Sequence, residues 1–401
     1  MQKGTCQTQG QHERREKIPF DFDAEVNRSE TASLKWDRYR GRDVIPLWVA
    51  DMDFRCPPAV IEAVRARADH GIFGYSLPPA ELVDVVSGML MQEYAWAVRP
   101  EWIVWLPGLV TGINVMCRAA GSDGDEVITS TPAYPPFLSA PGLSNRKLVT
   151  SPLIDKNGLY EFDFDHFQSC IGQRTRLFIL CSPHNPTGRV FTGKELARIA
   201  EICMKKDLIL CSDEIHCGLV LDQDKKHLPV AALGADIAAR TVTLMAPSKT
   251  FNIPGLGCSF AVIADKGMKK AFLKVMEGIV PHVNVFGYTA CLAAYRDCRD
   301  WHLELLDYLR ENRGIVARRV QGMEGLSMNH VEATYLAWIK VERKDLDDPA
   351  GFFEEAGVGL SDGAYFGSPG FVRLNFGCPS SLLNEALDRM ERALQGTSSQ
   401  G

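Results

Sequence analysis

Four loops of this sequence carry side chains that could bind or react with a small molecule. Lys249 lies in MAPSKTFNIPG, directly after an apolar run, and Asp213 begins the segment DEIH after the run LILCS. Asn185 lies in SPHNPTG after RLFILCS, and the loop PGLVTG follows WIVWL. Ligands of open α/β sheets bind where the carboxyl ends of the strands run into loops. We therefore expect these four loops to converge on one pocket.

Lys249 is the candidate nucleophile. A lysine at a strand end that is partly desolvated by Phe251 and Pro254 would have a lowered pKa, as imine formation with an aldehyde cofactor requires. The alternative is a surface lysine whose stem covers apolar neighbours while its charge reaches water. The lysine alone does not decide between these interpretations.

The loops after two other strands offer groups for an aromatic cofactor ring. Asp213 could pair with a protonated pyridinium nitrogen and so hold the ring as an electron sink, or it could only cap the following turn. His216 and the amide of Asn185 could reach the phenolic oxygen of the same ring, and Asn185 could also lie near a substrate carboxylate. The alternatives are a structural histidine and an ordinary N-P-T-G turn.

Two further segments suit anionic groups. The loop PGLVTG, residues 107 to 112, enters a helix, and helix N-termini bind phosphate through free amides and the helix dipole. Its glycine spacing matches neither a dinucleotide fingerprint nor a P-loop, and it could be an ordinary strand-to-helix turn. Arg373, inside the apolar run FVRLNF, could bind a carboxylate in bidentate fashion or form a buried structural ion pair.

The elements that must position these groups follow an α/β pattern. Short runs that are apolar throughout alternate with segments of helical periodicity such as GKELARIAEICMKK, which predicts a largely parallel sheet covered on both faces. After about residue 290, a long amphipathic helix, the runs TYLAWIKV and FVRLNF and a terminal helix predict a smaller α/β domain. We expect an N-terminal segment (1–59) that packs with the small domain, a large domain (60–285) and a small C-terminal domain (286–401).

Composition excludes several classes of partner. The 401 residues carry a formal net charge of −6 with no block rich in lysine or arginine, so we expect neither nucleic acid nor membrane as partner. No run approaches the roughly 20 apolar residues of a membrane span, and the first 20 residues have no signal-peptide core, which predicts a cytoplasmic protein. The 12 cysteines include no C-x-x-C pair, so we expect reduced thiols and no metal site.

The order of these groups resembles that of the fold-type I pyridoxal phosphate enzymes, the aminotransferase superfamily, in which N-P-T-G, D-x-x-[YH], S-K and a late arginine follow one another. The resemblance spans roughly residues 40 to 395. PLWVADMDF, GIFGYS, RPEWIVWLPGLVTGIN, TPAYPPF, DEIHCGLV and APSKTFNIPGL are together similar to the MalY/PatB group of cystathionine β-lyases. WVADMDF and SKTFNIPGL are the most specific of these motifs.

The resemblance implies a role for each candidate residue. Lys249 matches the imine-forming lysine, Asp213 the partner of the ring nitrogen and Asn185 the donor to the ring oxygen, with pyridoxal 5'-phosphate as cofactor. Tyr134 matches the aromatic residue that packs on the ring, and Arg373 matches the anchor of the substrate α-carboxylate.

The resemblance also implies a mostly parallel seven-stranded sheet, with helices on both faces, and a homodimer. In this dimer Tyr75 would reach the cofactor phosphate of the other subunit. Independently of the dimer, His216 would contact the cofactor ring. The remaining residues of the phosphate cup would be Gly108, Leu109, Val110 and Ser248.

Two positions depart from the typical aminotransferase pattern. The phosphate-binding arginine expected eight positions after the lysine is Gly257, and the serine expected three positions before it is Ala246. We therefore expect less fixed positive charge around the phosphate, which fits the lyase group better than a typical transaminase.

The expected reaction is α,β-elimination from L-cystathionine or another S-substituted L-cysteine to give a thiol, pyruvate and ammonia. Lys249, once displaced by the substrate amine, would remove the Cα proton. A class I/II aminotransferase is the alternative, and a regulatory protein that only binds the cofactor is a more distant one. The sequence does not indicate which sulfur substituent is preferred.

Overall fold

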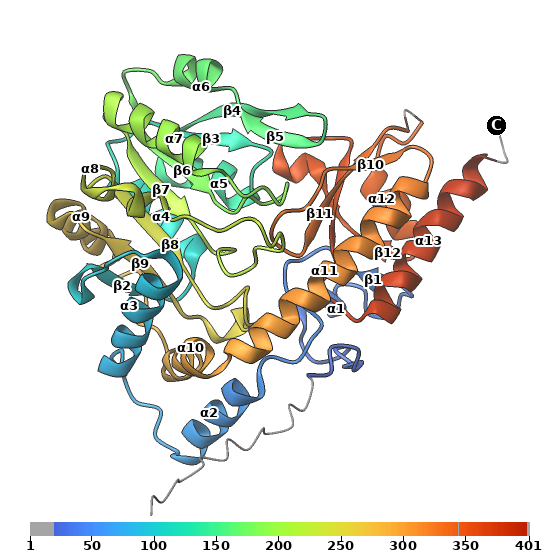
Figure 1. Cartoon of the computed structure of the whole chain (residues 1–401), viewed down its shortest axis with the longest axis horizontal. Coiled ribbons are helices and arrows are strands. Elements are labelled where there is room, and N and C mark those ends of the chain that lie inside the picture. Colours follow the sequence, from blue (N-terminus) through green and yellow to red (C-terminus); the bar gives the residue numbers. More distant parts are fainter. Residues whose placement is uncertain (1–19, 344, 399–401) are drawn as a thin grey trace, which may run out of the picture.

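A large sheet forms the centre of the computed structural model, which describes residues 20–343 and 345–398 (Figure 1). Its strand order is β2-β9-β8-β7-β6-β3-β4-β5. The strands are β2 (Ile103–Leu106), β3 (Glu126–Thr131), β4 (Lys147–Lys156), β5 (Leu159–Phe162), β6 (Thr175–Cys181), β7 (Ile209–Asp213), β8 (Thr241–Met245) and β9 (Ser259–Ile263).

The sheet is mostly parallel, as predicted, but it has eight strands instead of seven. β8, β7, β6, β3 and β4 run parallel, whereas β9 is antiparallel to both of its neighbours. The additional strand, β5, turns back along β4 through a two-residue loop. In this loop Asn157 and Gly158 both have positive φ, at 57° and 83°. An Asn-Gly pair favours such a hairpin, so the dipeptide was the signal for this strand.

Helices cover both faces of the large sheet, which explains why its strands are apolar throughout. In β6, Leu177 and Ile179 pack toward α4 and α9, whereas Phe178 and Leu180 pack toward α6 and α7 on the opposite face. The helices of this part are α2 (Pro58–Asp69), α3 (Ala80–Tyr94), α4 (Leu109–Ala119), α5 (Pro135–Ser139), α6 (Phe164–Cys170), α7 (Gly193–Lys205), α8 (Ala235–Ala238) and α9 (Lys266–Met276). Short 3-10 turns are η1 (Pro100–Trp102), η2 (Gly142–Ser144), η3 (Val230–Leu233) and η4 (Pro254–Leu256).

A second, antiparallel sheet follows in the C-terminal part, with the order β10-β11-β14-β13. It consists of β10 (Leu326–Met328), β11 (Leu336–Val341), β13 (Ser361–Asp362) and β14 (Phe371–Asn375). The accompanying helices are α10 (Val285–Asp297), α11 (Arg299–Gly322), α12 (Pro349–Glu355), η5 (Gly363–Phe366) and α13 (Ser380–Ser398).

The segment before residue 59 crosses to this C-terminal part. After α1 (Leu34–Asp37), strand β1 (Ile45–Pro46) pairs in parallel with β12 (Val358–Gly359). Leu47 and Met52 belong to the same hydrophobic cluster as Leu374 of β14. β1 and β12, which are far apart in the sequence, lie side by side (Figure 1). The domain boundaries at residues 59 and 285 stay a prediction.

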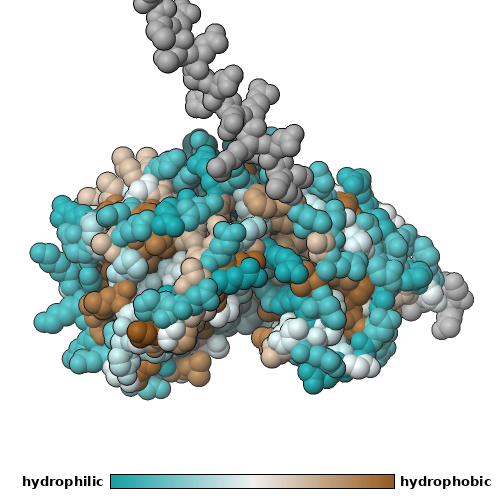
Figure 2. Space-filling view, turned by 90° about the horizontal axis from the view of Figure 1, so that it is seen from below, coloured by the Kyte–Doolittle hydropathy of each residue, from teal (hydrophilic) through white to brown (hydrophobic). Residues whose placement is uncertain are grey.

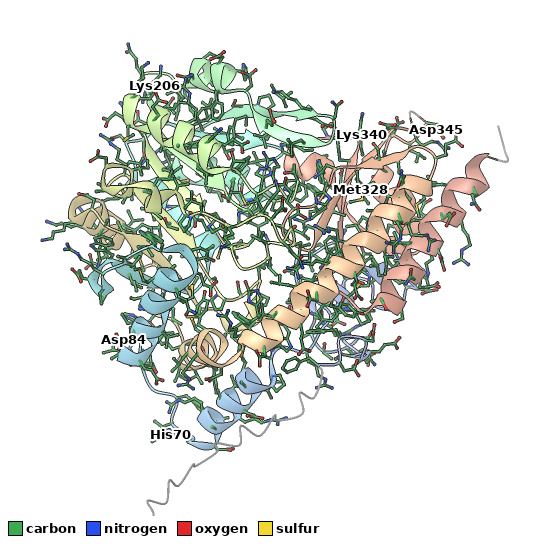
Figure 3. The ribbon with its side chains drawn as sticks, in the orientation of Figure 1. His70, Asp84, Lys206, Met328, Lys340 and Asp345 are labelled. Carbon is green, nitrogen blue, oxygen red and sulfur yellow. The ribbon has the colours of Figure 1, made fainter. Side chains whose placement is uncertain are left out.

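Many charged side chains lie on the outside of the molecule. Residues such as Asp84, Lys206 and Lys340 are exposed and lie at the periphery (Figure 3). One face is largely hydrophilic, with scattered hydrophobic residues and a hollow between its two halves (Figure 2). Within the described residues, no helix has the length and apolar character needed to cross a membrane, and no cluster of three or more His, Cys, Asp or Glu side chains could hold a metal ion.

Candidate active site

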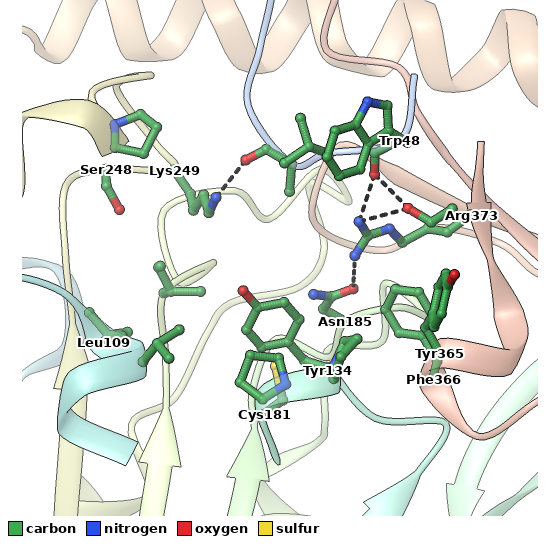
Figure 4. A pocket seen from close by; sticks show the side chains of 18 of the residues that line it. Trp48, Leu109, Tyr134, Cys181, Asn185, Ser248, Lys249, Tyr365, Phe366 and Arg373 are labelled. Carbon is green, nitrogen blue, oxygen red and sulfur yellow. Dashed lines mark hydrogen bonds between the residues drawn. The ribbon is translucent and has the colours of Figure 1, made fainter. Parts of the chain in front are cut away.

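A cavity of about 820 Å³ lies where β2, β6, β7 and β8 run into loops. All four loops singled out in the sequence line it, so their expected convergence is confirmed. Residues of the N-terminal segment and of the C-terminal sheet form its other wall (Figure 4). We call the wall of strand ends the floor, and the wall built by residues 38–50 and 348–373 the roof.

Lys249 lines the floor in the turn after β8. Its Nζ atom donates a hydrogen bond to the main-chain oxygen of Ala50 at 2.5 Å (Figure 4). Burial lowers the pKa of Lys249 to about 8, although the nearby carboxylate of Asp51 opposes this shift. The amine thus lies against the roof inside the molecule, and the interpretation as a surface lysine does not fit this geometry.

Asp213 and His216 are buried polar side chains with unused hydrogen-bonding capacity. One Asp213 oxygen, Oδ1, accepts from the N–H of Ile215 at 3.1 Å, so this aspartate does cap the turn after β7. Burial raises the pKa of Asp213 to about 7. Burial also lowers the pKa of His216 to about 3, and its Nδ1 atom has no hydrogen-bond partner among the described residues. Because buried polar groups are normally satisfied, both side chains fit a polar ligand in the cavity.

Arg373 of β14 is buried in the roof without a described carboxylate within salt-bridge distance. One terminal nitrogen donates to Oδ1 of Asn185 at 3.0 Å, and the other donates to the main-chain oxygen of Trp48 at 2.9 Å and to Oγ of Ser361 at 3.2 Å (Figure 4). Its Nε is buried and has no hydrogen-bond partner among the described residues. Burial lowers the pKa of Arg373 to about 10, which leaves it charged at neutral pH. A buried cation held only by neutral acceptors fits an anionic ligand, not the alternative of a structural ion pair.

Tyr134 follows β3 and lies in the cavity beside Asn185 and Cys181 (Figure 4). The pKa of Tyr134 is raised, mainly by burial and then by the charge of Asp213. The phenol therefore stays protonated at neutral pH and presents an aromatic surface next to Asp213.

The candidate phosphate site lies at the start of α4. Gly108 is the N-cap residue and makes no side-chain capping bond, so the first amides of the helix remain available. The other residues predicted for this site also line the cavity, namely Leu109, Val110 and Ser248.

The structure gives a physical reason for the missing arginine at position 257. Gly257 has φ of +59°, and a Cβ atom there would lie 3.3 Å from the main-chain oxygen of Pro107. Any other L-residue would be strained in this left-handed conformation. In the described loop between Lys249 and β9, no cationic side chain takes the place of that arginine. Ala246, at the second departing position, is buried beside the cavity.

Tyr75 does not reach the cavity of its own chain. Its side chain is fully exposed in the segment between α2 and α3, next to the exposed residues Phe73 and Leu77. The prediction placed this tyrosine in the other subunit's site, so a single chain leaves it a prediction.

Sequence reasoning missed the role of the main chain in WVADMDF. The oxygen of Ala50 accepts from both Lys249 and the hydroxyl of Tyr335, the latter at 3.0 Å. The amide of Asn375 donates to the oxygens of Val49 and Asp51 at 2.7 and 2.6 Å. Tyr335 and Asn375 thus hold the segment that forms the roof over Lys249.

The two most specific motifs contact each other directly. Asn252 of SKTFN accepts from the N–H of Met52 and donates to the oxygens of Met52 and Phe54, at 2.8 to 2.9 Å. Further down the motif, Asp53 accepts from buried Lys35 at 2.7 Å. The joint occurrence of the two motifs was the sequence signal for this contact, but it does not indicate which atoms form the hydrogen bonds.

The fold and this site define the class of protein. Residues 42–390 match the family model described as aminotransferase class I and II, and the chain belongs to this family. The chain is 36% identical to cystathionine β-lyase PatB of Bacillus subtilis, over 94% of this chain and 100% of that protein.

Solved structures agree with this assignment. The crystal structure of OvoB matches with a TM-score of 0.92 and 43% identity, over 94% of this chain and 99% of that one. Cystalysin from Treponema denticola, whose structure contains a pyridoxal 5'-phosphate cofactor, matches with a TM-score of 0.90 and 32% identity, over 95% and 100% of the two chains.

Proposed function

We propose that this protein is a pyridoxal phosphate-dependent carbon–sulfur β-lyase that acts on L-cystathionine or another S-substituted L-cysteine. The observation that carries the proposal is one cavity in which a lysine of lowered pKa, Lys249, lies with Asp213 and with the uncompensated cation Arg373. The similarity to PatB supports carbon–sulfur chemistry.

The residues of the cavity fit this cofactor. The free amides at the start of α4 and Ser248 suit its phosphate, and Asp213 suits its ring nitrogen. The unpartnered Nδ1 of His216 and the amide of Asn185 suit the ring oxygen, while Tyr134 suits the ring face. When bound, the cofactor supplies an electron sink that makes the Cα–H bond of the substrate acidic.

Lys249 is the proton carrier in this proposal. With a pKa of about 8, an appreciable fraction of its amine is neutral near pH 7 to 8 and able to accept the Cα proton. Ala50 offers a main-chain oxygen at 2.5 Å that holds the amine whenever it is free.

Arg373 is the substrate anchor. Its guanidinium binds the α-carboxylate, and its bonds to Trp48 and Asn185 fix its position. Cleavage of the Cβ–S bond then expels the thiolate with the bonding electron pair. The remaining three-carbon enamine takes up water and yields pyruvate and ammonia, which balances the reaction.

Transamination would use the same lysine and the same proton removal, so the products must separate the two activities. We expect the purified protein with bound cofactor to convert L-cystathionine, without added keto acid, into equal amounts of pyruvate and thiol. A shift of the cofactor absorption to its amine form, with no thiol released, would assign the protein to the aminotransferases.

A homodimer is the proposed assembly. Ile72, Phe73, Tyr75 and Leu77 are all exposed in one short segment, and a run of this kind fits burial against a second copy of the chain. We expect Tyr75→Ala to retain less cofactor on dialysis than the parent protein, and sedimentation to show a dimer. Equal cofactor retention would contradict a shared site.

A cytoplasmic location is also part of the proposal. All 11 cysteines of the described residues are free, which suits a reducing compartment.

A further inference from the structure

The roof of the cavity contains charged side chains that the elimination itself does not use. Arg38 and Asp362 line the same cavity as Lys249 and Arg373. Neither contacts Lys249 or Asp213 in any hydrogen bond or ion pair of the described residues. Their place in the cavity raises the question of what part of a substrate they contact.

Arg38 stacks on aromatic rings and makes one long ion pair among the described residues. Its guanidinium carbon lies 4.7 Å from the ring centroid of Trp48 and 5.5 Å from that of Tyr39. The nearest described carboxylate, Glu354, is 4.0 Å away and already pairs with Arg42 at 2.8 Å. Stacking therefore orders the Arg38 side chain, while no hydrogen bond among the described residues occupies its N–H donors, which leaves them available to an anion.

Trp48 connects this arginine to the anchor of the α-carboxylate. The main-chain oxygen of Trp48 accepts a hydrogen bond from Arg373, whereas the guanidinium of Arg38 stacks on the indole ring of Trp48. The guanidinium groups of Arg38 and Arg373 thus both contact Trp48, along a single wall of the cavity. This arrangement suits a substrate with two carboxylates joined by a short chain.

Asp362 supplies the opposite charge. It directly follows Ser361, which also contacts Arg373, and one of its oxygens accepts from the N–H of Ala364 at 2.9 Å. No described cation lies within salt-bridge distance of this half-buried carboxylate. Its second oxygen remains available to an ammonium group.

We propose that Arg38 and Asp362 determine specificity for the sulfur-linked group of the substrate, with Arg38 binding a carboxylate and Asp362 an ammonium. The preferred substituent is then itself an amino acid. This inference rests on the proposed lyase function and goes beyond it, because it assigns the far end of the substrate to two residues.

Four L-cysteine derivatives separate these contacts by charge. L-cystathionine carries both groups at its far end, S-carboxyethyl-L-cysteine only the carboxylate, S-aminoethyl-L-cysteine only the amine and S-propyl-L-cysteine neither. We would measure kcat/KM for pyruvate release from each, in the parent protein and in Arg38→Gln, Arg38→Lys and Asp362→Asn. Arg40→Gln is the matched control, because Arg40 is exposed on the same segment, does not line the cavity and, among the described residues, forms an ion pair only with Asp37, at 3.4 Å.

Arg38→Gln should lower kcat/KM about tenfold for the two derivatives with a far carboxylate and leave S-propyl-L-cysteine unchanged, a factor that corresponds to about 1.4 kcal/mol. The kcat/KM of Arg38→Lys should lie between those of the parent protein and Arg38→Gln, since lysine keeps the charge but lacks the planar guanidinium. Asp362→Asn should affect only the derivatives with a far amine.

Equal effects on all four derivatives, or no effect on any, would overturn the assignment while pyruvate release by the parent protein still supports the lyase. Absence of pyruvate from all four with the parent protein would overturn the lyase proposal and this inference together.

Discussion

The floor and the roof of the cavity hold their functional groups in different ways. On the floor, Asp213 ends strand β7 and Lys249 lies in the turn after β8, and burial has displaced the pKa values of both side chains. On the roof, the acceptors that hold Arg373 and Lys249 are largely main-chain oxygens, those of Trp48 and Ala50. The floor therefore provides reactivity, whereas the roof provides position.

The difference has a structural origin. A strand end of the large sheet, such as that of β7 at Asp213, is fixed by hydrogen bonds to the neighbouring strands, so its backbone is positioned without help from side chains. Residues 38–50 of the roof include only the two-residue strand β1, and this part of the chain is held instead by side chains such as Asn252 and Asn375. Changes on the floor should alter chemistry directly, and changes to the contacts that hold residues 38–50 should act through the placement of Lys249 and Arg373.

Removal of the floor amine is the largest expected effect. Lys249→Ala loses the group that would accept the Cα proton, and proton transfer by a positioned side chain is commonly worth about 10²–10⁴ in rate. We expect pyruvate release from L-cystathionine to fall roughly 10⁴-fold. Lys270→Ala, an exposed lysine of α9, is the control and should keep full activity.

A residual rate in Lys249→Ala within tenfold of the parent protein would exclude this lysine as the base. In that case the floor would supply only a binding surface.

The anchor of the roof should matter less than the floor amine. Arg373→Lys keeps a positive charge but cannot make the bonds to Asn185, Ser361 and a carboxylate at once. Charged hydrogen bonds contribute about 1.5–3 kcal/mol each, so kcat/KM should fall roughly 10²-fold. The loss should be the same for L-cystathionine and S-propyl-L-cysteine, because both carry the α-carboxylate. A loss confined to one of them would place Arg373 at the far end of the substrate instead.

The same contrast decides how much the sequence could reveal. Floor residues follow apolar runs, so Asp213, Asn185 and Lys249 were identified and the convergence of their loops was expected. Motif resemblance then assigned their roles. The roof could not be identified in this way, because every residue has a main-chain oxygen and nothing in WVADMDF marks the oxygen of Ala50 as the partner of a lysine.

Two other differences have local causes. β5 was missed because its partner β4 is largely exposed, with Ser151 and Leu153 as its buried residues, and is not an apolar run, so the Asn157–Gly158 turn was the signal for the hairpin. Arg38 was missed because an exposed arginine in a polar segment looks like solvated surface until the fold places Trp48 beneath it.

The titration of Lys249 gives a moderate effect that tests the floor without turnover. Only its neutral amine can react with the cofactor aldehyde, and burial has lowered its pKa from the ordinary value of 10.5 to about 8. The rate at which cofactor-free protein takes up pyridoxal phosphate should therefore rise roughly tenfold between pH 7 and pH 9 and then level off. Stopped-flow absorbance measures this rate.

Asp213, with a pKa of about 7, loses its proton over part of the same range. The profile should therefore be repeated with Asp213→Asn, in which only the lysine titration remains. A rate that still climbs beyond pH 10 would mean that Lys249 titrates as an exposed lysine.

The smallest expected effect concerns the contact between the two specific motifs. Asn252 has a φ of 53°, which glycine tolerates, so Asn252→Gly removes the bonds to Met52 and Phe54 without adding strain. We expect the free energy of unfolding to fall by about 1–3 kcal/mol, measured by urea titration. Asn157→Gly, at a φ of 57° in the β4–β5 turn, is the matched control for the flexibility of glycine.

If the roof positions the floor lysine, Asn252→Gly should also slow cofactor uptake several-fold, because the Ala50 oxygen would no longer hold the amine in place. Asn157→Gly should leave that rate unchanged. If Asn252→Gly is less stable but takes up cofactor at the parent rate, the roof does not position Lys249. The roof would then act only on the substrate, through Arg373.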